Sequence, residues 1–287
     1  MSAQAATARP VYRRRTSWRK VFNTILLYAA VIAVICPFMF IFVWMLLSSF
    51  KTTVQQTAYP PLFIFQPTLN NYVAVFHRVP FLSYALNSVI VSVSATLLGL
   101  VLGLPAAYSI ARWTQSRLAV VILISRMVPW ISFLLPWFLL FTNLGMVDTY
   151  PALILTHLII TMPMIIWLMI AFFEDVPAEL EDAALIDGCS RLGVFTRVAL
   201  PLASPGIVAS SILVLIYSWN NFIFALILAG RKTMTLPVSV YSFMSYTEVD
   251  WGGITAAATL IALPVLVLTF VIQRYLIKGL ALGGVKA

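Results

Sequence analysis

Long runs without a charged residue dominate the hydrophobic pattern. Five stretches contain no Asp, Glu, Lys or Arg: 21–50, 79–111, 149–173, 198–230 and 251–273. A sixth, 118–147, is interrupted only by Arg126. Each is at least as long as the roughly 20 residues that a helix needs to cross the hydrocarbon core of a bilayer. Because a helix satisfies its own backbone hydrogen bonds in lipid, the pattern predicts an all-α integral membrane protein with six transmembrane helices.

The composition excludes an ordinary soluble domain. Hydrophobic residues make up 62% of the chain and charged residues only 9%, whereas soluble domains carry about 25% charged residues. The first run is too long for the core of a signal peptide, so we expect it to be retained as the first helix. Cys36 and Cys189 indicate neither a disulfide framework nor a metal site.

The positive charges gather on one predicted side of the membrane. Of the 18 Lys and Arg residues, six precede the first run: Arg9, Arg13, Arg14, Arg15, Arg19 and Lys20. If six helices alternate, seven more lie on that same side: Arg112, Arg117, Arg191, Arg197, Arg274, Lys278 and Lys286. The other side has only Lys51, Arg78, Arg231 and Lys232. By the positive-inside rule both termini are cytoplasmic, and the net charge of +9 reflects orientation and contact with membrane lipid, with no nucleic-acid partner.

The inner connection at about 174–202 is the most informative segment. It holds six of the nine acidic residues: Glu174, Asp175, Glu179, Glu181, Asp182 and Asp187. Leu180, Ala183, Ala184 and Asp187 follow one another at helical spacing. Gly188 suits a helix end and Ser190 suits the cap of a second helix. The segment is therefore predicted to be two short helices separated by a glycine turn, and composition alone allows it to be a plain connector.

The same segment resembles the signature of ABC importer permeases. That signature is Glu-Ala-Ala, three residues, Gly, nine residues, Ile, any residue and Leu-Pro. This chain has Asp182-Ala183-Ala184, Gly188, and Val198-Ala199-Leu200-Pro201 at the same spacing, with Asp in place of Glu and Val in place of Ile. Glu181 could supply the longer acid instead, so the acting carboxylate is left open at this stage.

Further stretches, from about residue 20 to the end, resemble the maltose-type second permease of the carbohydrate-uptake family. They are Pro67-Thr68-Leu69-Asn70-Asn71-Tyr72, Leu86-Asn87-Ser88, Asp187-Gly188, Leu200-Pro201-Leu202, Trp219-Asn220, and the tail from Gln273-Arg274-Tyr275 through Gly279 to Gly283-Gly284-Val285-Lys286. The resemblance implies a type I ABC importer permease fold with a cytoplasmic coupling helix. It divides the chain into a basic segment 1–20 and a transmembrane domain 21–287. That domain would hold a first helix at about 21–50, core helices at about 83–277 and a tail at 278–287.

The resemblance also implies partners and a division of labour. A second, homologous permease, two ATPase subunits and a periplasmic or extracellular sugar-binding protein would complete an importer in the bacterial inner membrane. The ATPase contact would be formed by Glu181, Asp182, Ala183, Ala184, Gly188, Leu200 and Pro201. The tail would reach toward the ATPase, and the outer loop 230–252 would touch the binding protein. No Gly-x-x-x-x-Gly-Lys-Ser/Thr phosphate loop occurs in the sequence, so ATP and Mg would be used by the ATPase subunits, and this chain would bind no cofactor and carry no catalytic site.

Polar residues within the runs are candidates for the solute pathway. Tyr217, Trp219, Asn220 and Asn221 cluster near the expected middle of the fifth helix, where aromatic rings could stack on a sugar and amides could bind its hydroxyls. Helix packing explains them equally well. Arg126 is a further pathway candidate, although snorkelling or a bond to carbonyls is favoured over it. For His157 we expect a hydrogen bond between helices rather than a ligand.

Three other functions compete with a sugar permease. An ion-coupled secondary carrier would need acids within its helices, and none of the nine lies in a charge-free run. A membrane enzyme would need a nucleophile, base or metal cluster, which the acids of 174–202 do not form. An ABC permease for another solute, such as a phosphorylated polyol, would share the coupling loop and differ only in its pathway.

Overall fold

The computed structural model describes residues 18–113, 115–244 and 249–283, and it divides into a unit that ends at Leu47 and a unit that begins at Ser48. The first unit consists of α1 (Trp18–Ser49) up to Leu47. Its apolar side chains from Phe22 to Val43 are largely exposed, as suits a helix whose solvent is lipid. Residues 1–17 of the predicted basic segment lie outside the described residues.

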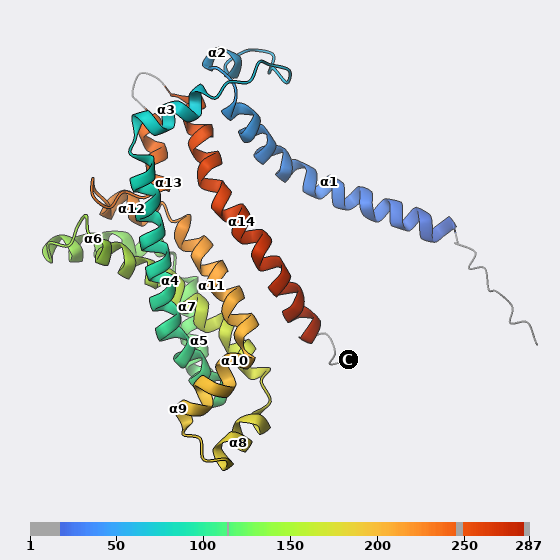
Figure 1. Cartoon of the computed structure of the whole chain (residues 1–287), viewed down its shortest axis with the longest axis vertical. Helices are drawn as coiled ribbons and strands as arrows, with labels where there is room; N and C mark the ends of the chain where they lie inside the picture. Colours follow the sequence, from blue (N-terminus) through green and yellow to red (C-terminus); the bar gives the residue numbers. More distant parts are fainter. Residues whose placement is uncertain (1–17, 114, 245–248, 284–287) are drawn as a thin grey trace, which may run out of the picture. The chain divides into compact units, whose positions relative to one another are not determined.

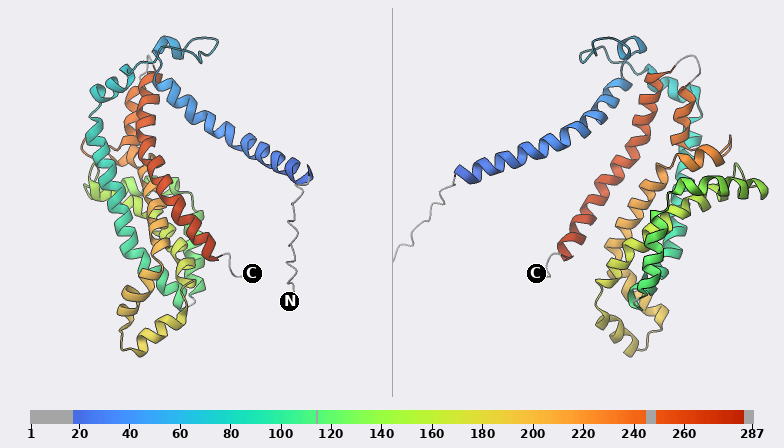
Figure 2. Two further views of the ribbon diagram at one scale, coloured as in Figure 1. Left: turned by 45° about the vertical axis from the view of Figure 1, so that its right-hand side comes forward. Right: turned by 180° about the vertical axis from the view of Figure 1, so that it is seen from behind.

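The second unit is built around four long helices that lie side by side: α4 (Phe81–Arg112), α7 (Tyr150–Glu174), α11 (Ser204–Trp219) and α14 (Trp251–Gly283) (Figures 1 and 2). α4 packs most extensively against α7, and α11 contacts α4, α7 and α14. Gly99 and Gly103, one turn apart on α4, allow the close approach. A Cβ at these positions would lie 2.9 and 3.0 Å from side-chain carbons of Ile165 on α7.

Two of the six predicted spans are bent pairs of helices in the structure. Four helices, α1, α4, α7 and α14, are long and apolar enough to cross a membrane, and two bent pairs bring the number of spans to six if each pair is one span. In the first pair, α5 (Ser116–Met127) meets η1 (Trp130–Phe133) and α6 (Leu134–Asn143) at 84°. The bend falls at Val128 and Pro129, where proline removes a backbone donor. Pro136 lies within α6 without breaking it.

The second broken span joins the 174–202 segment to α11. α9 (Arg191–Val194), the π-helical turn η2 (Phe195–Ala199) and α10 (Leu200–Leu202) meet α11 at 76°. α8 (Ala178–Ile186) and α9 lie at one end of the four-helix bundle (Figure 1). The last long helix, α14, continues to Gly283. Residues 278–283 of the expected tail are therefore helical, and 284–287 lie outside the described residues.

Short elements cover the opposite end of the bundle. They are α2 (Thr53–Gln56), α3 (Asn70–Arg78), α12 (Ile223–Leu228), α13 (Leu236–Ser239) and η3 (Val240–Phe243). Asn87 of α4 holds the segment that leads into α13: its Nδ2 donates to the carbonyls of Lys232 and Met234 at 3.0 and 2.9 Å, and its Oδ1 accepts from the Tyr150 hydroxyl at 2.7 Å. The neighbouring Ser88 hydroxyl accepts from the backbone N–H of Leu236. These bonds fix the segment 230–236 to the ends of α4 and α7.

A polar contact also joins two of the long helices within the bundle. Nδ1 of His157 on α7 lies 2.7 Å from Oγ of Ser218 on α11, and both residues are buried. The expectation of a hydrogen bond between helices at His157 is confirmed. Such a bond fixes the rotation of one helix against the other, which apolar packing alone specifies less tightly.

Asp148 closes the connection between α6 and α7 against the segment 230–233. Its carboxylate accepts hydrogen bonds from the backbone N–H groups of Gly230, Lys232 and Thr233 and from the Thr233 hydroxyl. Burial alone would raise the pKa of this carboxyl, but the bonds from Thr233, Lys232 and Gly230 favour the charged form and hold its pKa below the ordinary 3.8. Asp148 itself has a φ of +59°, a conformation that Asp tolerates better than most residues.

The hydrogen bonds that the Asp148 carboxylate accepts, here called the Asp148 clamp, generate a prediction about stability. Asp148→Asn should lower the midpoint of thermal unfolding of the detergent-solubilised protein at pH 7, by an amount equivalent to about 1 kcal/mol for a half-buried group. Asp175→Asn, which removes an exposed carboxyl at the other end of the bundle, is the matched control and should leave the midpoint unchanged.

The pH dependence of that difference tests the cause. Because the folded pKa is depressed, the contribution of Asp148 is complete above pH 3.8 and is lost as pH falls through the lower, folded value. The two midpoints should therefore converge in that acidic range. A difference that persists unchanged at all pH values would contradict the carboxylate clamp.

Candidate functional site

The connection between α7 and α11 folds as two short helices separated by a glycine turn, as predicted. Pro177 precedes α8, and Glu179 and Glu181 fall in its first turn, where carboxylates complement the helix dipole. Gly188 ends the helix with a φ of +89°, a conformation that favours glycine. The Ser190 hydroxyl then accepts a hydrogen bond from the backbone N–H of Gly193 at 3.1 Å and caps α9.

A buried ion pair fastens α8 to the end of α4. Nη2 and Nε of Arg112 donate to Oε1 of Glu181 at 2.6 and 2.9 Å, and the Tyr108 hydroxyl donates to Oε2 at 2.7 Å. Nη2 of Arg112 also donates to the carbonyl of Val176 at 2.9 Å. The Glu181 and Arg112 side chains are only 8% and 16% exposed. Both carboxylate oxygens are thus satisfied, which a pair removed from water requires.

The opposite face of this segment is open. Ile186 and Leu192 are 87% and 71% exposed, and Asp182 and Ala183 are exposed beside them. A Cβ added at Gly188 would meet no atom within 4 Å. We call these five residues the loop-tip surface. Exposed aliphatic side chains around small residues and one acid are suited to contact with another protein.

The predicted coupling residues therefore separate into two groups. Asp182, Ala183 and Gly188 lie on the loop-tip surface, whereas Glu181 turns inward. The remaining three lie between these groups or nearer the membrane: Ala184 is half-buried, Leu200 packs at the edge of the core, and Pro201 is exposed in α10. The sequence does not decide between Glu181 and Asp182 because the partner of Glu181, Arg112, is 69 residues away in the chain.

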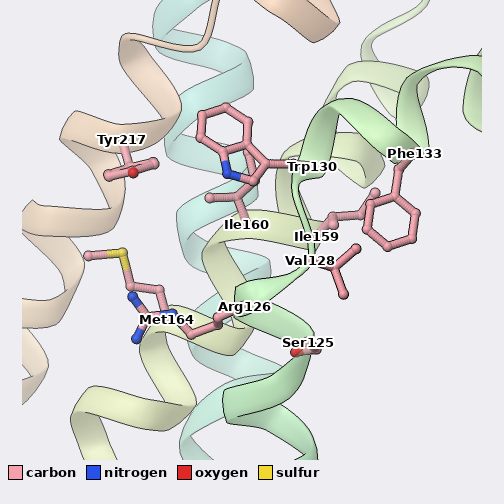
Figure 3. A pocket seen from close by; sticks show the side chains of 9 residues that line it. All are labelled: Ser125, Arg126, Val128, Trp130, Phe133, Ile159, Ile160, Met164 and Tyr217. Carbon is pink, nitrogen blue, oxygen red and sulfur yellow. The ribbon is translucent and has the colours of Figure 1, made fainter.

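A pocket lies where α5 breaks, between α5, α7 and α11. Figure 3 shows Arg126 extending across it from the last turn of α5 toward Met164 of α7. Trp130, after the break, and Tyr217 of α11 line the same pocket, with ring centroids 6.1 Å apart and planes inclined by 60°. Two pathway candidates far apart in sequence, Arg126 and Tyr217, are thus brought together.

A second pocket shares Trp130 and Tyr217 and adds Asn220 and Asn221. Its volume is about 530 Å³, within the roughly 300–1,000 Å³ usual for small-ligand sites. The expectation that this cluster lies near the middle of a helix is wrong. α11 ends at Trp219, and the chain turns at Asn220 and Asn221 before α12 begins at Ile223, so the two amides flank a helix end.

Trp219 faces away from both pockets. It is 8% exposed, and its Nε1 donates to the carbonyl of Ile261 on α14 at 3.2 Å. Trp219 therefore fastens α11 to α14. Of the two aromatic residues in the predicted cluster, Tyr217 lines both of these pockets and Trp219 lines neither.

Neither pocket resembles a metal centre. Within residues 18–113, 115–244 and 249–283 no group of three His, Cys, Asp or Glu side chains could hold a metal ion, and the two cysteines are free thiols. The chemistry available in the pockets consists of aromatic faces, amides and the guanidinium of Arg126.

Comparison with known proteins places this geometry in context. Residues 99–282 match the family described as binding-protein-dependent transport system inner membrane component. The chain is 39% identical over 251 residues to the probable ABC transporter permease protein y4oR of Sinorhizobium fredii, covering 87% of this chain and 91% of that protein. It is 32% identical over 265 residues to the trehalose/maltose transport system permease protein MalG of Thermococcus litoralis, covering 90% and 94%.

The fold also matches a solved structure. A chain of a bacterial ABC transporter involved in the import of the acidic polysaccharide alginate superposes with a TM-score of 0.72. The match covers 93% of this chain and 99% of that chain at 20% identity, and it therefore speaks for the fold alone.

The buried ion pair generates a prediction about the loop. Glu181→Gln leaves the Arg112 guanidinium buried without its counter-charge, which typically costs about 3–5 kcal/mol. Amide hydrogen exchange across 176–194 should accelerate strongly in this variant. Glu179→Gln, an exposed acid of the same helix, is the control and should exchange like the wild type.

A double replacement distinguishes the loss of the whole ion pair from the cost of leaving one buried charge unpaired. Arg112→Met with Glu181→Leu removes both charges, so its exchange should be slower than that of Glu181→Gln. Equal exchange in the wild type and Glu181→Gln would show that the ion pair does not hold the loop.

Proposed function

This chain belongs to the family of inner membrane components of binding-protein-dependent transport systems, and we propose that it is the membrane-spanning permease subunit of an ATP-driven importer of a sugar or sugar derivative. It is a multi-pass transport subunit and not an enzyme; ATP is hydrolysed by a separate chain. The observation that carries the proposal is the loop-tip surface at family spacing, joined to the bundle by the buried pair of Glu181 and Arg112.

The loop-tip surface is the proposed docking site for an ATPase subunit. Ala183 and Gly188 have no bulky side chain, so a partner's surface can approach the backbone closely. Ile186 and Leu192 would lose their exposed apolar area on docking, which favours association. Asp182 supplies the outward charge, and we propose that it, rather than Glu181, acts in the contact.

The ion pair supplies the mechanical link. Closure of two ATPase subunits on ATP and Mg would move α8, and the pair of Arg112 with Glu181 would carry that displacement into α4. Because α4 packs along most of α7, the two helices would move together. The solute pathway would then alternate between its inward-open and outward-open states.

The two ends of the bundle indicate where the remaining partners would bind. We propose that the α8 end and both termini are cytoplasmic in the bacterial inner membrane. The segment 230–252 and the elements α3 and α13 would then face a sugar-binding protein. A second, homologous permease would complete the pathway, with α1 in contact with membrane lipid.

The pockets at Trp130 and Tyr217 are the proposed solute pathway. Aromatic rings stack on the C–H faces of sugars, and the amides of Asn220 and Asn221 can bind hydroxyl groups. The trehalose/maltose permease among the relatives supports a sugar as the solute.

Gly188→Asp tests the docking role. The substitution strains a backbone with a φ of +89° and places a charge on the docking surface. In the purified complex it should reduce solute-stimulated ATP hydrolysis by about tenfold or more, the loss expected from one disrupted interface hot spot. Insertion into the membrane should be normal, because the residue lies outside the spans.

Gly145→Asp is the matched control for that variant. Gly145 also has a positive φ, +65°, and no atom within 4 Å of an added Cβ, but it follows α6 at the other end of the bundle. It carries a similar backbone strain without touching the loop-tip surface, so stimulated hydrolysis should be retained. Normal stimulated hydrolysis in Gly188→Asp would refute the docking role.

The apolar part of the surface yields a separate prediction. Ile186→Ser with Leu192→Ser should reduce the amount of ATPase subunit recovered with the permease from detergent, because both side chains are exposed in the isolated chain and buried on docking. Leu139→Ser with Leu140→Ser, an exposed pair on α6, should not. Undiminished recovery with the first pair would exclude Ile186 and Leu192 from the contact.

A further inference from the structure

Arg126 lies near the end of α5, inside the run 118–147 that contains no other charged residue. It is the eleventh of the twelve residues of α5, which begins directly after α4 ends at Arg112 and therefore at the same face of the bilayer. At about 1.5 Å per residue it lies roughly 15 Å along the helix from its first residue, Ser116. Its side chain extends across the pocket toward Met164 of α7 (Figure 3).

Arg126 has no counter-charge among the residues that the structure describes. Among the described residues its guanidinium takes part in neither of the two ion pairs, and no hydrogen bond is made by it. All nine acidic residues of the sequence lie in the connections between spans or, in the case of Glu174, at the last residue of α7. A charge inside so long an apolar run requires water, a ligand or a partner of opposite sign.

The surroundings of Arg126 are those of a ligand site. Figure 3 shows its guanidinium on the side of the pocket where Tyr217 and Met164 lie. Trp130 and Tyr217 form a wall shared with the larger pocket of about 530 Å³. The site lies at the break between α5 and η1, and transporters use such helix breaks to line solute pathways.

We infer that the transported solute carries an oxyanion group, and that Arg126 binds this group while Trp130 and Tyr217 stack on the attached sugar ring. The inference rests on the proposed function and names its substrate class: an acidic sugar or sugar ester. The planar guanidinium matches two oxygens of a carboxylate, sulfonate or phosphate. A fixed acid from a partner permease is the competing explanation. It would satisfy the charge but would leave the aromatic wall and the adjoining volume without a role.

The test compares two sugars that differ only at one carbon. Glucuronate and glucose are titrated separately into the complete complex in nanodiscs, and binding is followed by saturation-transfer NMR. Wild type should bind glucuronate more tightly, and Arg126→Gln should weaken glucuronate binding by about tenfold or more while leaving glucose unchanged. Arg126→Lys should retain part of the preference, because it keeps the charge without the planar fork.

Arg117→Gln is the matched control. It removes the same charge from an exposed position at the start of the same helix, away from the pocket, and should bind both sugars as the wild type does. If inorganic phosphate displaces glucuronate from the complex, the oxyanion is the group that is recognised. A phosphate ester would then also be an admissible solute.

Two results would overturn the inference. One is equal binding of the two sugars to wild type. The other is a glucuronate preference that survives Arg126→Gln. Loss of the second permease from the Arg126→Gln complex, without any sugar preference in wild type, would assign Arg126 to a partner's acid. In each of these cases the proposed function still holds if an ATPase subunit remains bound to the complex and active. If the wild-type complex contains no ATPase subunit, the proposed function itself is contradicted.

Discussion

The bilayer supplies no hydrogen bonds to an exposed backbone, and the arrangement of this chain depends on that constraint. Long helices carry the chain across, and the irregular segments lie at the two ends of the bundle or line a pocket. At the outer end proposed here, Asn87 and Asp148 satisfy the backbone of the 230–236 segment with side-chain bonds. The break at Val128 and Pro129 lies between two apolar helices, and it borders the pocket that contains Arg126.

A docking loop must be firmly attached if it is to transmit force. The 174–202 segment meets this requirement because its inward face bears a carboxylate held by Arg112 and Tyr108, while its outward face remains free. Two adjacent acids thus have different tasks in our account: Glu181 anchors, and Asp182 faces the partner. Since α4 contains both Tyr108 and Arg112, movement of the loop would reach the α4 and α7 pair before the rest of the bundle.

The sequence predicted much of this fold and less of the site. Charge-free runs located the spans because the bilayer demands about 20 apolar residues whatever their packing. The helix, glycine turn and Ser190 cap of the loop were predictable because each depends on residues a few positions apart. The Arg112–Glu181 pair was not, since it joins residues 69 apart. Trp219 and Tyr217 are two positions apart on α11 and therefore point to opposite faces, one buried against α14 and the other lining a pocket; the sequence did not show which face meets α14.

The central claim is that this chain works as one subunit of an ATP-driven importer. The most direct test is to purify it in mild detergent from its native host and to identify the accompanying proteins by mass spectrometry. Our account predicts an ATPase subunit and a second, homologous permease. Recovery of this chain alone, in a form that still transports solute without ATP after reconstitution, would contradict the account.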